Sequence, residues 1–135
     1  MSRRPPHLLR VEEGPQSFAV LIAAAAAAGL RVGWLELAAP ESIAPELEAA
    51  TAAGAQRAVA AGGSRSVAVK PLRGAPVLRD LLREHFAGCA LVLVRGEIDA
   101  PVLAATAEGW EVRSESARLA TLADLIDRLR RPRLF

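Results

Sequence analysis

Residues Glu12 to Ser17 (EEGPQS) could do chemistry, because they follow the first apolar run and precede a helix. In α/β proteins such strand-to-helix turns bind ligands, since their backbone N–H groups and the helix N-terminus attract phosphate. A nucleoside triphosphate also needs several small residues and a Lys that reaches the outer phosphates. This turn has one glycine, no Lys, a proline and two carboxylates. We predict an eroded phosphate loop, in which only Gly14, Gln16 and Ser17 could still contact GTP or ATP, and no hydrolysis.

Other polar side chains are weaker candidates for catalysis. Glu97 and Asp99 follow an apolar strand, where α/β folds often place functional carboxylates, and they fit either a metal ion or a plain polar loop. His7 stands beside two prolines and His85 on a charged helix face, so we expect both to be solvated. Cys89 adjoins a buried strand and is expected in the core. One cysteine and two distant histidines predict neither a disulfide nor a zinc site.

The segment 128–135 is the one cluster of like charge, with four arginines within six residues. Arginines at the end of a helix are favoured by the negative end of the helix dipole. The same arginines, followed by two apolar residues, are also typical of a tail that docks on an acidic partner. Both interpretations stay open. If the tail docks, the partner-binding residues are Arg130, Arg131, Arg133, Leu134 and Phe135.

The elements that must position these residues alternate between strands and helices, which predicts an α/β domain with a mostly parallel sheet flanked by helices. The expected strands are 8–12, 31–37, 90–94 and 110–113, with a β-hairpin of 57–61 and 66–72. The expected helices are 16–28, 42–53, 77–87, 101–107 and 117–130. The first helix is apolar nearly all round, so we expect it to be buried on more than one side. Strand 90–94 should be buried on both faces, Trp34 in the core and Trp110 at an edge.

The composition bounds the class of protein. With 135 residues, 52% hydrophobic and 24% charged, the chain predicts a single domain over 1–135 with a short tail and excludes intrinsic disorder. The net charge is only +2, and 16 of the 17 basic residues are Arg, a bias that suits a G+C-rich genome. We therefore expect no nucleic-acid partner. The longest apolar run, 18–29, is too short to cross a bilayer, so we expect a cytoplasmic protein without membrane contact.

Three longer segments, taken with the opening strand, turn and helix, are similar to the sequence pattern of a known family. They are 29–35 (GLRVGWL), 53–69 (AGAQRAVAAGGSRSVAV) and 76–97 (PVLRDLLREHFAGCALVLVRGE). Together they resemble the adaptor proteins of molybdopterin-guanine dinucleotide biosynthesis, the MobB type of P-loop GTPase. The resemblance implies a three-layer fold like that of P-loop NTPases and a homodimer. The chain departs from the family pattern in the missing Lys and in Arg95, which stands where the family has an acidic residue.

These observations lead to one functional hypothesis and an alternative. The first is a non-hydrolysing, MobB-like adaptor or binding protein with a protein partner and no cofactor, acting in molybdenum-cofactor biosynthesis or delivery. The alternative is a degenerate RecA-like accessory protein that docks on a DNA-repair partner through its C-terminal tail. A small enzyme would have to rely on Glu97 or Asp99.

Overall fold

A computed structural model describes residues 4–37 and 44–135 of the chain. Contacts between residues divide these into two compact units, and each is described by itself. The larger unit comprises the described residues 4–37 and 78–135, and the smaller one residues 44–77.

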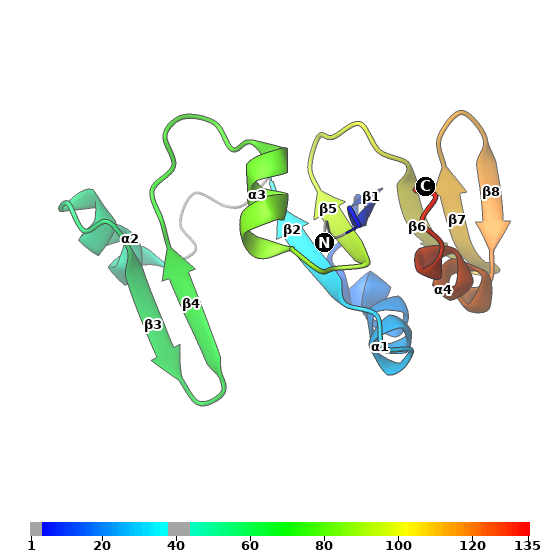
Figure 1. Ribbon diagram of the computed structural model, residues 1–135, viewed down its shortest axis with the longest axis horizontal. Helices are drawn as coiled ribbons and strands as arrows, with labels where there is room; N and C mark the ends of the chain where they lie inside the picture. Colours follow the sequence, from blue (N-terminus) through cyan, green and yellow to red (C-terminus); the bar gives the residue numbers. More distant parts are fainter. Residues whose placement is uncertain (1–3, 38–43) are drawn as a thin grey trace. The chain divides into compact units, whose positions relative to one another are not determined.

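The larger unit is built on a six-stranded mixed sheet in the order β2-β5-β1-β6-β7-β8 (Figure 1). Its strands are β1 (His7–Val11), β2 (Val32–Glu36), β5 (Leu91–Arg95), β6 (Val102–Thr106), β7 (Gly109–Arg113) and β8 (Ala117–Ala120). The first four in the sheet order run parallel, and β7 and β8 are antiparallel to their neighbours. The amino-terminal ends of β1, β2 and β5 therefore lie together along one side of the sheet, which we call its amino-terminal edge. Their carboxyl ends lie together along the opposite side, the carboxyl edge.

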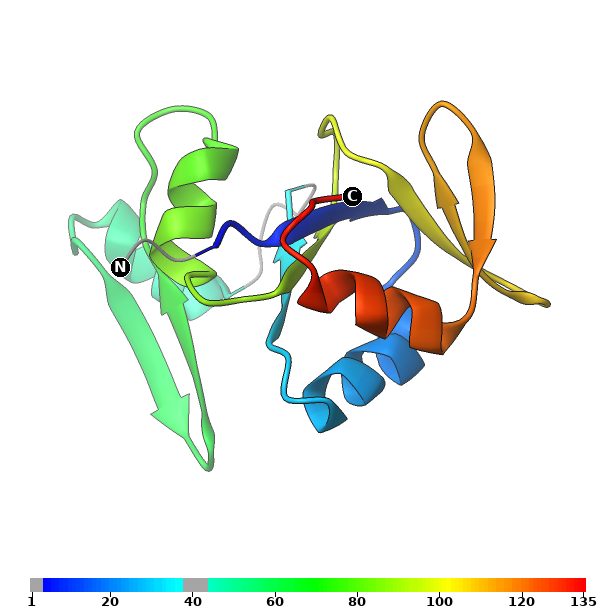
Figure 2. The ribbon, with the colours of Figure 1, turned by 45° about the vertical axis from the view of Figure 1, so that its right-hand side comes forward.

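Helices flank this sheet. After β1 come the 3-10 helix η1 (Pro15–Phe18) and α1 (Ala19–Ala27), and α4 (Leu122–Arg130) packs beside α1 (Figure 2). Both helices bury leucines against the strands, namely Leu21 from α1 and Leu125 and Leu129 from α4. On the other face, a Cβ added to Gly33 would lie 2.3 Å from the ring of Phe86, which directly follows α3 (Leu78–His85). Because side chains alternate along a strand, Gly33 faces away from its core-packed neighbours Val32 and Trp34.

The core is centred on β5, as its continuous apolar run predicts. Leu91 to Val94 have no exposed surface, which confirms burial on both faces. Phe18 is also fully buried, and its ring lies 6.0 Å from that of Trp34 and 6.1 Å from that of Trp110. The expected position of Trp110 at an edge is wrong, because β7 lies between β6 and β8 and the indole is 8% exposed.

Two predicted helices are wrong. Segment 101–107 forms strand β6, because it pairs with β1 and with β7 and turns sharply at residues 107–108. The predicted helix 117–130 is strand β8 followed by the shorter α4. Thr121 separates the two: its side chain accepts a hydrogen bond from the Asp124 N–H while the Asp124 carboxylate accepts one from the Thr121 N–H. This capping box fixes where α4 begins.

The first helix also differs from its prediction. It is divided into η1 and α1, and only Leu21 and Ala25 of α1 are buried, so burial on more than one side is wrong. The physical reason is that the larger unit packs just one side of this helix, against the sheet and α4.

The smaller unit contains helix α2 (Pro45–Ala52) and a two-stranded antiparallel sheet of β3 (Ala58–Gly62) and β4 (Arg65–Val69). The predicted hairpin is confirmed, with Gly62 paired to Arg65 across the turn. Residues 42 and 43 of the predicted second helix lie outside the described residues. Ala58 is the single buried hydrophobic residue among those described in this unit.

Candidate functional site

The turn that should hold a phosphate lies at the carboxyl edge of the sheet, directly after β1. Gly14 is extended, Pro15 begins η1, and the Ser17 N–H donates to the Gly14 carbonyl oxygen at 3.2 Å. Glu12 and Glu13 are exposed at the same turn. The Ser17 N–H is thus bonded internally, and the carboxylates would repel an anion.

An ion pair stands beside this turn. Arg95, the last residue of β5, directs Nη1 toward Glu36 Oε1 at 3.3 Å, and a Cβ on Gly14 would lie 3.5 Å from the same Nη1. Glu36 Oε1 also accepts a hydrogen bond from the Trp34 indole N–H at 2.9 Å. The guanidinium closest to the turn therefore already has a carboxylate partner.

The predicted phosphate loop, Gly14, Gln16 and Ser17, is brought together by η1, but its chemistry does not fit a nucleoside triphosphate. The turn lacks a Lys, Pro15 within it has no backbone N–H, and the neighbouring Arg95 is paired with Glu36.

The two acidic candidates after β5 lie apart from any metal-ligand cluster. Glu97 Oε1 accepts from Arg10 Nη2 at 3.0 Å and is 91% exposed, and Asp99 is exposed. Within residues 4–37 and 44–135, no three His, Cys, Asp or Glu side chains gather as metal ligands would. Glu97 and Asp99 are therefore solvent-exposed side chains at the carboxyl edge of the sheet.

His7 contradicts its prediction, because it is 3% exposed and not solvated. It is the first residue of β1, and it shares a face of that strand with the buried Leu9 and Val11. Its Nε2 donates to the Arg131 carbonyl oxygen at 2.9 Å. Its alternation with Leu9 and Val11 was the signal in the sequence that could have placed it in the core.

The C-terminal tail lies against the chain's own core. The ring of Phe135 contacts His7 edge-on at 5.3 Å, and the Arg128 guanidinium stands 5.3 Å from the same ring. Arg128 also donates to the Leu134 carbonyl oxygen at 2.9 Å. Phe135 is thus held within the molecule. The four other residues of the predicted docking set are exposed at the surface, namely Arg130, Arg131, Arg133 and Leu134.

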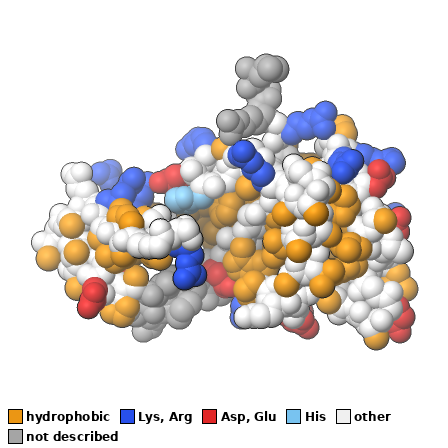
Figure 3. Space-filling model, turned by 90° about the horizontal axis from the view of Figure 1, so that it is seen from below, with side chains coloured by type: hydrophobic (Ala, Val, Ile, Leu, Met, Phe, Trp, Pro, Cys, Tyr) orange, Lys and Arg blue, Asp and Glu red, His pale blue; other side chains and the backbone are white. Residues whose placement is uncertain are grey.

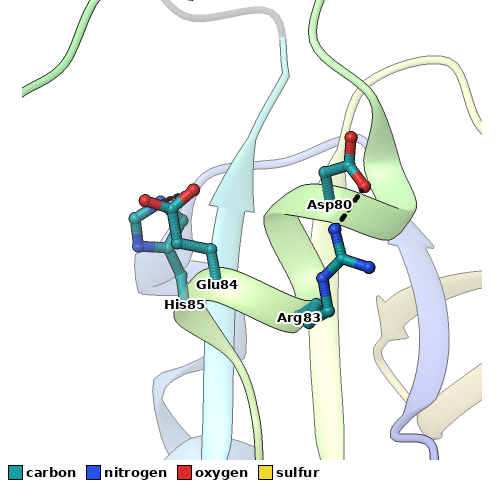
Figure 4. A network of polar contacts seen from close by, with 4 residues as sticks. All are labelled: Asp80, Arg83, Glu84 and His85. Atoms are coloured by element: carbon teal, nitrogen blue, oxygen red, sulfur yellow. Dashed lines mark hydrogen bonds and ion pairs between the residues drawn. The ribbon is translucent and has the colours of Figure 1, made fainter.

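His85 and Cys89 take different places. His85 is solvent-exposed at the end of α3, where it neighbours Glu84, while Asp80 and Arg83 form an ion pair of 3.0 Å one turn earlier (Figure 4). Its expected solvation is confirmed. Cys89 is half-buried, and burial raises the pKa of its thiol while the charge of Arg31 opposes that rise.

The comparisons with known proteins add no family. No protein-family model matches the chain, and no curated protein matches it. Among the described residues, no helix is both long and apolar enough to span a membrane.

Proposed function

We propose that the protein is a non-hydrolysing adaptor that works through protein–protein contact, beginning with a second copy of itself. The observation that carries this proposal is the exposed apolar face of α1. The helix contains no charged or polar residue, yet only Leu21 and Ala25 are buried.

The exposed half of α1 forms one continuous surface. Figure 3 shows hydrophobic side chains gathered over this helix. At 100° per residue, five of its exposed residues lie on one side, namely Ala19, Val20, Ala23, Ala26 and Ala27. Val20 is 65% exposed. A surface helix normally presents charged residues to water, so an apolar outer face favours contact with another protein.

A second copy of the chain suits this surface because its residues are small. Alanine side chains let two helix backbones approach closely, and a two-fold dimer brings the same patch together from both subunits. The homodimer is also what the resemblance to the MobB type implies.

The turn after β1 supports the non-hydrolysing part of the proposal. In the sheet order β2-β5-β1-β6, the chain passes from β1 beyond β5 to β2, and later from β5 beyond β1 to β6. This order supports the P-loop-NTPase-like fold that we propose for the larger unit. At the turn after β1 the chain has Pro15, an internally bonded Ser17 N–H and the Arg95–Glu36 pair. These features support a scaffold without nucleotide turnover of its own, and the proposed place in molybdenum-cofactor biosynthesis rests on the resemblance to the MobB type.

Sedimentation tests the contact surface. We expect the purified protein to sediment at twice the 14.2 kDa of the chain, and Val20→Glu to sediment as a monomer, since it places a charge on the apolar face. Leu119→Glu is the matched control, because Leu119 is 67% exposed on β8, and it should remain dimeric. A monomeric wild-type protein would contradict the self-contact.

Thermal unfolding with GTP and ATP, with and without magnesium, tests the claim that the turn after β1 does not bind nucleotide. A ligand at about 100 times its Kd adds about 2.7 kcal/mol of stability. We expect no such shift, and we expect affinity capture from the native cells to recover a nucleotidyltransferase or molybdoenzyme. A GTP-specific shift would overturn the claim that the turn is inactive.

A further inference from the structure

An open cavity of about 450 Å³ lies at the amino-terminal edge of the six-stranded sheet. Its walls come from the segments that precede β1, β2 and β5 and from the end of α4. Four arginines line it, and none of its lining residues is Asp or Glu. The arginines are Arg4, Arg31, Arg130 and Arg131.

Three of these four guanidinium groups have no carboxylate partner among the described residues. Arg131 Nη2 is paired with Asp127 at 2.9 Å, and Arg130 Nη2 donates only to the carbonyl oxygen of Ala28 at 3.4 Å. Within residues 4–37 and 44–135, no carboxylate lies within ion-pair distance of Arg4 or Arg31. The cavity therefore collects positive charge that the protein itself leaves uncompensated.

The fold explains only part of this charge. Helices α1 and α4 both end at this edge, and the negative ends of their dipoles attract cations, which accounts for Arg130 beside the Ala28 carbonyl. Arg4 and Arg31 precede strands and belong to no helix. The four side chains are exposed, so water screens part of their mutual repulsion, and an anion bound among them would offset the rest.

One wall of the cavity is formed by a buried side chain. His7 lines it, and its Nδ1 is buried without a hydrogen-bond partner in the described structure, while Nε2 holds the Arg131 carbonyl oxygen at 2.9 Å. The neighbouring Ala90 N–H donates to the Arg31 carbonyl oxygen at 2.8 Å, which fixes the backbone from which the Arg31 side chain extends.

We propose that this cavity binds a small polyvalent oxyanion, such as a diphosphate or a tricarboxylate. Guanidinium groups bind both kinds of group through paired N–H donors, and several of them suit a ligand with more than one negative charge. A volume of about 450 Å³ is typical of small-molecule sites and exceeds what one water or one chloride needs. Because the arginines line one hollow and do not form a long stripe, we favour a small ligand over a nucleic-acid backbone.

Titration calorimetry at low salt tests this proposal with two probes, inorganic pyrophosphate and citrate, which separate phosphoryl from carboxylate ligands. We expect at least one of them to bind saturably at one site per chain. Arg31→Gln and Arg130→Gln should each weaken that binding by tenfold or more. Arg113→Gln removes the same charge from β7, outside the cavity, and should change the affinity by less than twofold.

Three results would overturn the proposal that the cavity binds an oxyanion. It fails if neither probe binds, or if Arg113→Gln weakens binding as much as the cavity variants do, since net charge alone would then explain it. Binding of a single-stranded oligonucleotide in the absence of binding by either probe would also overturn it. Thermal unfolding of each variant checks that the fold is intact, and Arg31→Lys should retain part of the affinity because it keeps the charge.

Discussion

The two edges of the six-stranded sheet carry opposite arrangements of charge. At the carboxyl edge, Arg95 and Arg10 each have a carboxylate partner, Glu36 and Glu97. At the amino-terminal edge, Arg4 and Arg31 line a cavity to which no acidic residue contributes. In α/β folds ligands usually bind at the carboxyl edge.

In this molecule the position that the topology favours for a ligand and the residues suited to bind one lie at opposite ends of the sheet. The turn after β1 keeps the position of a ligand site, while its Ser17 N–H is bonded internally and its nearest guanidinium is paired with a carboxylate. The opposite edge has no such topological reason to bind anything, yet it holds the uncompensated charge. Function has to be argued from the residues, since a fold alone does not supply it.

The largest loss of stability is expected from a substitution in the core that supports both edges of the sheet. Phe18→Ala removes a fully buried ring that contacts Trp34 and Trp110, and it should lower the free energy of unfolding by about 3–5 kcal/mol. Leu119→Ala, at a side chain that is 67% exposed on β8, should change it by about 0.5 kcal/mol or less. Urea denaturation at a protein concentration fixed for all variants measures both. Equal effects would mean that the turn is not anchored by this core.

A smaller loss of stability, from the cap of α4, tests whether the cavity binds pyrophosphate independently of the stability of that helix. Thr121→Ala removes the cap of α4, and the free energy of unfolding should fall by about 1 kcal/mol. Thr121→Ser keeps the hydroxyl and should recover most of it. Neither variant touches the cavity at the other end of α4, so pyrophosphate affinity should stay unchanged. A parallel loss of affinity would show that the cavity arginines act only through helix stability.

Glu36→Gln sharpens the comparison by making the carboxyl edge resemble the amino-terminal one. It leaves Arg95 without its carboxylate beside Gly14. The pair is half-exposed, so the free energy of unfolding should change by less than about 1 kcal/mol. We expect weak pyrophosphate binding to appear at the turn, whereas Glu97→Gln, at the exposed Arg10 pair, should produce none. Calorimetry on the Arg31→Gln background isolates this new binding.

The smallest expected effect is a pH dependence from His7. Burial, and secondly the charge of Arg128, lower the pKa of this imidazole below its usual 6.5, against hydrogen bonds to the Arg131 and Leu129 carbonyls. The unfolded chain then binds more protons than the folded one between the lowered pKa and 6.5, so stability falls as the pH drops through that window. His7→Gln should flatten the slope measured by denaturation between about pH 5 and 7. An unchanged slope in His7→Gln would refute the assignment.

Much of the fold could be predicted from local patterns. The continuous apolar run in β5, the glycines of the β3–β4 hairpin and the alternation of strands with helices were sufficient for those elements. Segments 101–107 and 117–120 were mistaken for helices because alanine-rich runs have high helix propensity, and only pairing across the sheet makes them strands.

The sites were harder to predict, because they depend on residues distant in the sequence. The turn at 12–17 is local, and its lack of Lys is visible in the sequence. The Arg95–Glu36 pair joins residues 59 positions apart, and the basic cavity joins Arg4 to Arg130. Nothing in local spacing brings such residues together, so only the strand order reveals them.

One measurement tests the contrast between the two edges most directly: amide chemical-shift mapping of the isotope-labelled protein during a pyrophosphate titration. We expect saturable shifts at Arg31, Cys89 and Arg130 around the cavity, and none at Gly14, Gln16 and Ser17. Saturable shifts at the turn, with the cavity amides unmoved, would contradict it and return the ligand site to the carboxyl edge of the sheet.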